Sequence, residues 1–554
     1  MTAIDTSLSH TIGASEPPLL TTTIGDNLRQ TVADHGSRDA LIVRPHGDTP
    51  GTRYTYDQLW AEVDLLARAL LAKGFVKGDR IGVWAPNVTE WVLTQFATAR
   101  LGIIQVNINP AYRTHEVQYA LAQSGCRGLV AVTDFKTSNY RAMIDEVRGD
   151  LPELEHVIFI GDPSWDELMA LADQKTSADV EAVEATLSPD EPINIQYTSG
   201  TTGFPKGATL SHRSILNNGY NVGEACDYTE QDRVCVPVPF YHCFGMVMGT
   251  LGCTTHGAAI IVPAPSFEPV ATLEAVQDER CTSLYGVPTM FIAQLAESGF
   301  DGYDVSSLRT GIMAGSPCPI EVMRQTIDKM HMTDVTIAYG MTETAPVSTQ
   351  TATDDPIDKK VGTVGRVQPH IEVKVVDPET GETVPRGTSG EFCTKGYSVM
   401  VGYWNDPDKT AEAIDADGWM HTGDLAVMDD EGYVNIVGRI KDLIIRGGEN
   451  VYPREVEEFL YTHPNVRDVQ VVGVPDRKYG EEIMAWIQTE DGSEMTLDEV
   501  KEYCKGKIAH YKVPRYVMTT NEFPMTVTGK IQKFKLRDDA IEHLDLSSHI
   551  TETA

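Results

Sequence analysis

Two kinds of hydrophobic spacing alternate along the first part of the chain. Short apolar runs, such as residues 80–84 and 128–132, fit buried strands, and residues 56–71 carry the three-to-four residue spacing of one helix face. This alternation extends from about residue 54 to residue 335. It predicts an α/β fold in which sheets are covered by helices.

The spacing changes twice further along the chain. Between about residues 345 and 438, short apolar stretches are separated by Asp-Pro, Gly-Thr and Asp-Gly turns, which predicts a small β-barrel-like subdomain. Beyond it, helical patterns at 453–460 and from 497, with strand patterns at 469–474 and 483–489, predict a small α+β domain. We therefore expect two domains, a large one of residues 1–440 and a small one of residues 441–554.

Length and composition narrow the class of protein. The chain has 554 residues, of which 41 % are hydrophobic and 23 % are charged, as in ordinary globular proteins. It contains no apolar run long enough to cross a bilayer. Residues 1–20 lack the pattern of a secretory or mitochondrial targeting segment, so we expect a frayed arm there. These features predict a folded cytoplasmic protein without an integral membrane segment.

The net charge of −35 argues against nucleic acids and anionic membranes as partners. Any anionic ligand must then be held by local groups. Residues 501–515 carry five basic side chains against the single acid Glu502. A solvated helix face and a phosphate-contacting role explain this stretch equally well.

The nine cysteines are scattered and include no C-x-x-C pair, which predicts reduced, buried thiols. Cys235, His242 and Cys243 lie near one another in the sequence. They lack the spacing of metal-ligand sets, so core packing explains them better.

A loop rich in glycine and hydroxyl side chains follows the alternating strand pattern at residues 193–197. Glycines let backbone N–H groups face an anion, hydroxyls add donors and a lysine adds positive charge. The lysine precedes the last glycine, so this is not the pattern G-x-x-x-x-G-K-[ST]. On composition alone, a flexible turn explains the loop as well as a phosphate cradle does. The candidate phosphate ligands are Thr198, Ser199, Gly200, Thr201, Thr202, Gly203 and Lys206.

Further motifs follow this loop in the order found in the adenylate-forming superfamily, which includes acyl-CoA synthetases. They are Pro-Phe-Tyr-His-Cys-Phe-Gly at 239–245, Gly-Ile-Met-Ala-Gly-Ser-Pro-Cys-Pro at 311–319, Tyr-Gly-Met-Thr-Glu at 339–343, Thr-Gly-Asp at 422–424 and Pro-Met-Thr-Val-Thr-Gly-Lys at 524–530. The chain resembles this family over residues 54–530, nearly its whole length.

The resemblance implies an ATP site with assigned roles. Tyr339 stacks near adenine, Thr342 contacts the α-phosphate and Glu343 holds Mg²⁺, an ion that prefers hard oxygen ligands. Asp424 accepts from the ribose hydroxyls, with Arg439 beside it. An exposed ion pair is the structural alternative for these last two residues. The remaining residues implied around the nucleotide are Gly315, Ser316, Pro317, Gly340 and Met341.

The resemblance also implies two half-reactions. ATP and an acid first form an acyl-AMP, with Lys530 bridging the developing charges; the small domain then rotates about Lys441, and coenzyme A attacks. The loop that meets coenzyme A holds Gly447, Gly448 and Glu449. Without the family match, Lys530 would be an ordinary surface lysine.

The acyl group is expected beside His242, which borders the acyl site in the family, with Tyr241, Phe244 and Met246 lining the pocket. These side chains favour a medium- to long-chain fatty acid, although aromatic and methionine residues at this spacing also form ordinary core. Three alternatives stay open: a carrier-protein thiol as acceptor, an aryl or other acid as substrate, and a non-catalytic nucleotide-binding protein. A monomer and a homodimer are both compatible with the sequence.

Overall fold

The computed structural model describes residues 6–47, 50–198, 205–447, 449–490, 492–526 and 531–546. Among these residues, no helix combines the length and the hydrophobicity that a bilayer crossing needs. All nine cysteines are buried, and no disulfide joins them. Buried, unpaired thiols are what the sequence predicts.

A seven-stranded sheet forms one layer of the N-terminal part. The strands at 80–84 and 128–131 confirm the two apolar runs read as buried strands. Five of the strands run parallel, and parallel sheets need cover on both faces. The strand order is β21 (Gly402–Tyr403), β11 (Lys206–Ser211), β10 (Pro192–Thr198), β5 (Ile104–Asn107), β4 (Arg80–Trp84), β6 (Gly128–Ala131) and β9 (His156–Phe159).

A nine-stranded sheet forms the second layer. Its six middle strands run parallel, and antiparallel strands close both edges. The carboxyl ends of the parallel strands therefore lie along one edge, where open α/β sheets bind ligands. The strand order is β18 (Arg366–Val367), β17 (Val347–Gln350), β16 (Asp334–Gly340), β15 (Thr310–Ala314), β14 (Ser283–Gly286), β12 (Arg233–Cys235), β13 (Ala259–Val262), β2 (Asp39–Val43) and β3 (Thr52–Thr55).

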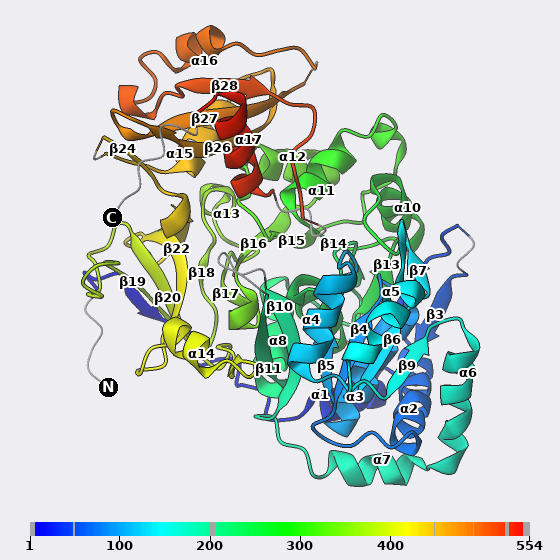
Figure 1. Cartoon of the computed structure of the whole chain (residues 1–554). Helices are drawn as coiled ribbons and strands as arrows, with labels where there is room; N and C mark the ends of the chain where they lie inside the picture. The colour runs from blue at the N-terminus through cyan, green and yellow to red at the C-terminus, as the bar shows by residue number, and fades with distance from the viewer. Residues whose placement is uncertain are drawn as a thin grey trace.

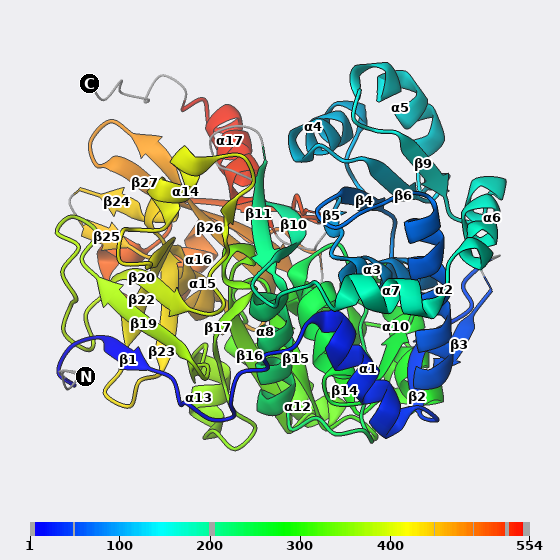
Figure 2. The ribbon, with the colours of Figure 1, turned by 90° about the horizontal axis from the view of Figure 1, so that it is seen from below.

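Helices fill the space between the two sheets and cover their outer faces. The largest apolar cluster joins both sheets through the helices between them, and Figure 2 shows two of these, α3 and α7, in that position. The helix expected at 56–71 is confirmed as α2, which begins with a capping box of Thr55 and Gln58. The inner helices are α1 (Ile24–His35), α2 (Tyr56–Ala72), α3 (Thr89–Leu101), α7 (Ser177–Glu184) and α8 (His212–Ala225). The outer ones are α4 (Thr114–Ser124), α5 (Tyr140–Val147), α10 (Pro269–Glu279), α11 (Pro288–Leu295) and α12 (Ile320–Met330).

A five-stranded antiparallel sheet lies beside these layers (Figure 1). The turn-rich stretch supplies four of its strands and also the helices α13 (Ile357–Gly362) and α14 (Pro407–Ala413). Its strands β17 and β18 belong to the nine-stranded sheet and β21 to the seven-stranded sheet, so the β-barrel-like subdomain at 345–438 stays a prediction. The expectation of a frayed N-terminal arm is wrong, because residues 10–12 pair with the edge strand and Ser9 is fully buried. An exposed sheet edge offers unpaired backbone groups to such a segment. The strand order is β1 (His10–Ile12), β19 (Ile371–Val376), β20 (Gly390–Gly396), β22 (Met420–Met428) and β23 (Val434–Arg439).

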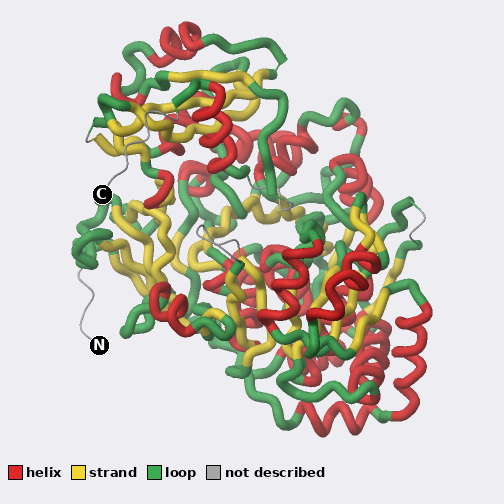
Figure 3. Tube along the Cα trace, in the orientation of Figure 1, coloured by secondary structure: helices red, strands yellow, loops and turns green. Residues whose placement is uncertain are grey.

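The C-terminal part has its own sheet and its own apolar core. Two apolar clusters contain only residues beyond 443, and Figure 3 shows the strands and helices of this part gathered at the top of the molecule. All four elements expected here are confirmed. The elements are β24 (Ile444–Arg446), β25 (Glu449–Val451), α15 (Pro453–Tyr461), β26 (Val466–Asp476), β27 (Gly480–Thr489), α16 (Leu497–Cys504), β28 (Tyr516–Thr519) and α17 (Lys533–His543). The domain boundary at residue 441 stays a prediction.

Candidate active site

Three of the predicted motifs lie at one edge of the nine-stranded sheet. His242 comes after β12, Gly315 directly follows β15, and Thr342 comes just after β16. These three strands run parallel in the same sheet, so their carboxyl ends share that edge. Gly315 and Pro317 are exposed and Ser316 is half-buried. Backbone is therefore accessible where the resemblance places adenine.

The Glu343 carboxylate accepts hydrogen bonds from hydroxyl groups in two other parts of the chain. The Thr198 hydroxyl donates to Glu343 Oε1 at 3.1 Å, and the Tyr403 hydroxyl donates to the same oxygen at 2.9 Å. Lys206 Nζ lies 4.3 Å from the centre of the Tyr403 ring. Glu343 itself is buried, with 5 % exposure. Strand β10 therefore ends and strand β11 begins beside the carboxylate expected to hold Mg²⁺, and the predicted phosphate loop connects these two strands.

A second cluster surrounds Asp424. The Tyr339 hydroxyl donates to Asp424 Oδ2 at 2.6 Å, and Arg439 Nε donates to Oδ1 at 3.0 Å. Asp424 and Arg439 are paired across the antiparallel strands β22 and β23. Burial and the Asp424 carboxylate raise the pKa of Tyr339 well above its usual value, so this hydroxyl remains a donor. A carboxylate can accept from both hydroxyls of a ribose at once.

The segment from Tyr339 to Glu343 joins the two clusters. Tyr339 at the end of β16 contacts Asp424, and Glu343, four residues on, contacts Thr198 and Tyr403. Gly340 lies where an added Cβ would meet the carbonyl oxygen of Pro346 at 1.7 Å, so a side chain has no room there. Glu343 O also accepts from Met400 N at 2.9 Å, which fixes the segment from a third side.

The residues expected around the acyl group do not all face one space. His242 Nδ1 accepts from the backbone N–H of Phe244 at 3.3 Å, at the start of a π-helical segment, Phe244–Leu251. The Phe244 ring lies 5.5 Å from the Tyr285 ring of β14. Met246 points the other way, because its Sδ accepts from Asn107 of β5 at 3.4 Å. Phe244 therefore faces one sheet and Met246 the other, while the half-buried Tyr241 precedes His242.

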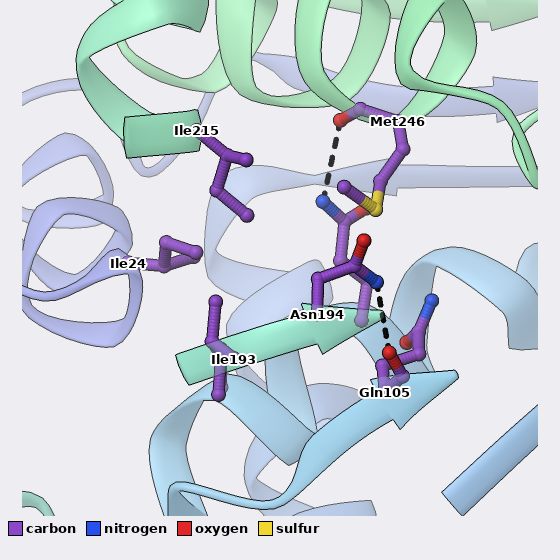
Figure 4. Close-up of a pocket in the computed structure, with 8 residues that line it drawn as sticks. Ile24, Gln105, Ile193, Asn194, Ile215 and Met246 are labelled. Carbon is purple, nitrogen blue, oxygen red and sulfur yellow. Dashed lines mark hydrogen bonds between the residues drawn. The ribbon is translucent and has the colours of Figure 1, made fainter. Parts of the chain in front are cut away.

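Met246 lines a small internal cavity (Figure 4). The cavity volume is about 10 Å³, which is room for about one water molecule. Among the described residues, Gln105 Oε1 and Asn194 Oδ1 are buried without a hydrogen-bond partner. Such acceptors are suited to one buried water and not to an acyl chain. The other residues that line the cavity are Ile24, Gln95, Ala99, Ile193 and Ile215.

The sites expected in the C-terminal part are described only in part. Lys441 is exposed in a short 3₁₀ turn, Ile440–Asp442, directly after β23. Gly447 has a positive φ of 61° and donates its N–H to the Tyr479 carbonyl at 2.7 Å. Glu449 is exposed at the start of β25. Seven predicted residues lie outside the described residues: Ser199, Gly200, Thr201, Thr202, Gly203, Gly448 and Lys530.

The sequence reasoning missed Tyr403. This tyrosine lies 60 positions from Glu343 in the chain, and the edge strand β21 brings its hydroxyl to the carboxylate. The only local signal is an aromatic pair, Tyr403 and Trp404, after a glycine, and such a pair is common in ordinary core. Burial and Glu343 raise the pKa of the Tyr403 hydroxyl, so it remains a hydrogen-bond donor.

Sequence comparisons agree with this arrangement. A Bacillus subtilis protein named as an acyl-CoA synthetase, YngI, is 49 % identical over 96 % of this chain and 99 % of its own length. The mitochondrial medium-chain acyl-CoA ligase ACSF2 of Homo sapiens is 44 % identical over 97 % of this chain and 91 % of its own length.

Solved structures show the same architecture. The anthranilate CoA ligase AuaEII in complex with anthranoyl-AMP has a TM-score of 0.85 and 27 % identity, covering 96 % of this chain and all of that one. ATP-bound MatB from Rhodopseudomonas palustris has a TM-score of 0.80 and 29 % identity, covering 94 % and 99 %. The predicted α/β fold is thereby confirmed. The AMP-binding enzyme profile matches residues 28–404 and the AMP-binding enzyme C-terminal domain profile matches residues 455–530, so the chain belongs to the AMP-binding enzyme family.

Proposed function

We propose that this chain is an ATP-dependent acid:CoA ligase that acts on a medium-chain fatty acid. One observation carries the proposal. Thr198, Lys206 and Glu343 meet at the sheet edge where a polyphosphate would lie, and Tyr339 connects this group to Asp424, which is suited to a ribose. The names of the full-length relatives support an acyl-CoA product and a medium-chain acid.

In the first half-reaction a substrate carboxylate attacks the α-phosphorus of ATP, and pyrophosphate leaves. Both reactants are anionic, so the protein must neutralise charge and fix geometry, and it needs no nucleophile of its own. Lys206 supplies positive charge beside the phosphate loop, and Thr342 lies next to Glu343 to contact the α-phosphate. Lys530 would bridge the substrate carboxylate and that phosphate.

The Glu343 carboxylate fits a magnesium ion. It offers hard oxygen atoms, and Mg²⁺ in ATP sites is usually bound by one or two carboxylates together with phosphate oxygens. The Thr198 and Tyr403 hydroxyls both donate to Oε1, and this holds the carboxylate in one orientation. When bound, the ion would reduce the negative charge on the phosphates.

In the second half-reaction the thiol of coenzyme A attacks the acyl-AMP carbonyl and AMP leaves. A lysine that bridges the carboxylate and the α-phosphate in the first half-reaction would block the approach of the thiol. A rotation of residues 441–554 about Lys441 would move Lys530 away and free that face. We also propose that Gly447, Gly448 and Glu449 then border the coenzyme A arm. The nine buried thiols support a reducing compartment such as the cytoplasm.

Acid-dependent exchange of labelled pyrophosphate into ATP tests the proposal. The purified chain should catalyse exchange that is highest with medium-chain fatty acids and lower with acetate, palmitate and benzoate. Adding coenzyme A should then yield acyl-CoA and AMP. Exchange without thioester formation would indicate a carrier-protein acceptor. No exchange with any acid would leave only a nucleotide-binding protein.

A further inference from the structure

The Thr422–Asp424 segment is a bulge in strand β22. Glu391 of β20 pairs with Leu425, and Cys393 pairs with His421. Three residues of β22, 422–424, therefore lie opposite the single residue 392 of β20. A bulge leaves backbone groups without ladder partners and re-aims the side chains that it carries. Here the redirected side chain is Asp424.

Glu391 provides a partner for one backbone group of this bulge and contacts the residue before it. Its Oε1 accepts from the backbone N–H of Gly423 at 3.1 Å, and its Oε2 lies 2.8 Å from His421 Nδ1. Gly423 has a positive φ of 71°, as a sharp local turn requires. The Thr422 hydroxyl accepts from Asp424 N at 3.1 Å and donates to the Phe392 carbonyl at 2.7 Å. One carboxylate therefore fixes the residues on both sides of Thr422.

We propose that Glu391 is a positioning residue for nucleotide binding, which acts on the ribose through Asp424. The N–H that Glu391 holds belongs to the residue directly before Asp424. Asp424 in turn must present both oxygens to the ribose at hydrogen-bonding distance, so a small rotation of the bulge removes that contact. This inference rests on the proposed function, because it takes Asp424 as the ribose ligand.

Calorimetric titration with ATP and with dideoxy-ATP, which lacks both ribose hydroxyls, tests the proposal. Glu391→Ala should weaken ATP binding about tenfold and dideoxy-ATP binding less than about twofold. Glu391→Gln keeps an acceptor for Gly423 N–H and should stay within about threefold of wild type for ATP. Thr422→Val, which removes the other support of the bulge, should give the same selective loss as Glu391→Ala.

A matched control lies in the same sheet. Glu372 of β19 forms a similar glutamate–histidine pair, with Oε1 2.5 Å from His10 Nε2. Glu372→Ala should leave both dissociation constants unchanged. The proposal is overturned if Glu391→Ala weakens both nucleotides equally or neither, if Glu372→Ala does the same as Glu391→Ala, or if the wild type binds both nucleotides equally well. Pyrophosphate exchange by the wild type is measured separately, so its absence would contradict the proposed function instead.

Discussion

Replacing Tyr403 by phenylalanine tests whether the Glu343 carboxylate is held in place for a metal ion. Two hydroxyls donate to the same carboxylate oxygen, that of Tyr403 at 2.9 Å and that of Thr198 at 3.1 Å. Tyr403 is buried, with 6 % exposure, and its raised pKa keeps the hydroxyl protonated at any pH used in an assay. The substitution therefore removes one of two donors and leaves the ring in place.

The size of the effect follows from the kind of contact. A hydrogen bond to a charged group contributes about 1.5–3 kcal/mol, and loss of a partner that orients a metal ligand lowers metal affinity about 10–100-fold. Because Thr198 still holds the carboxylate, we expect the lower end. The free Mg²⁺ concentration at half-maximal exchange should rise about tenfold. The rate at saturating Mg²⁺ should stay within about threefold of wild type, since no group that touches the phosphates is removed.

The assay is acid-dependent pyrophosphate exchange, measured over a range of free Mg²⁺ at fixed ATP. Tyr433→Phe is the matched control, because it removes a tyrosine hydroxyl that donates to the buried Asp355 carboxylate at 2.5 Å, in a contact that includes none of the candidate site residues. An unchanged Mg²⁺ midpoint in Tyr403→Phe, or an equal shift in both variants, would refute the reasoning.

Three further predictions concern the two half-reactions and stability. Lys530→Ala should abolish pyrophosphate exchange but leave thioester formation from supplied acyl-AMP largely intact; equal loss of both in separate assays would contradict the rotation. Arg100 is fully buried between the carboxylates of Glu184 and Asp64, at 2.6 and 2.9 Å. Arg100→Met should cost about 3 kcal/mol in denaturant unfolding, the low end for a broken buried pair, because Arg29 and Arg68 still contact these two carboxylates. The half-exposed Arg53, replaced by Met, should cost about 1 kcal/mol or less. Burial lowers the pKa of His212 to about 4. Between pH 6.5 and 4 this site gains a proton only in the unfolded state. The Tm of the wild type should therefore fall more steeply than that of His212→Asn as the pH is lowered through this range, and equal slopes would contradict the prediction.

Local patterns were sufficient for most of the fold. Residues 80–84 and 56–72 form a strand and a helix because their apolar spacing and the Thr55 cap match those elements without help from distant residues. The prediction of a frayed N-terminal arm was wrong because the order there comes from a distant strand. Residues 10–12 carry little strand pattern of their own, and they are ordered by the free edge of β19, which is more than 350 positions away.

The candidate site also contains residues that the sequence predicted and residues that only the structure revealed. The order of the motifs was sufficient to predict Glu343 as the Mg²⁺ ligand and Asp424 as the ribose ligand, because these roles follow from residue type and from neighbours in the chain. The sequence did not indicate Tyr403 or Glu391. Tyr403 contacts Glu343, and Glu391 contacts Gly423, only because separate strands pack together. Phe244 and Met246, two positions apart in one apolar run, turned out to face different sheets.

The sequence by itself determined most of the secondary structure elements and the kinds of side chain available for ATP chemistry, because spacing and residue type act locally. Only the tertiary structure decided which of those side chains share a carboxylate oxygen, which strand is bulged to aim Asp424, and which apolar residues face which sheet. The physical reason is that a hydrogen bond or a packing contact depends on positions fixed to within a few tenths of an ångström, and that precision arises only when many distant segments pack together.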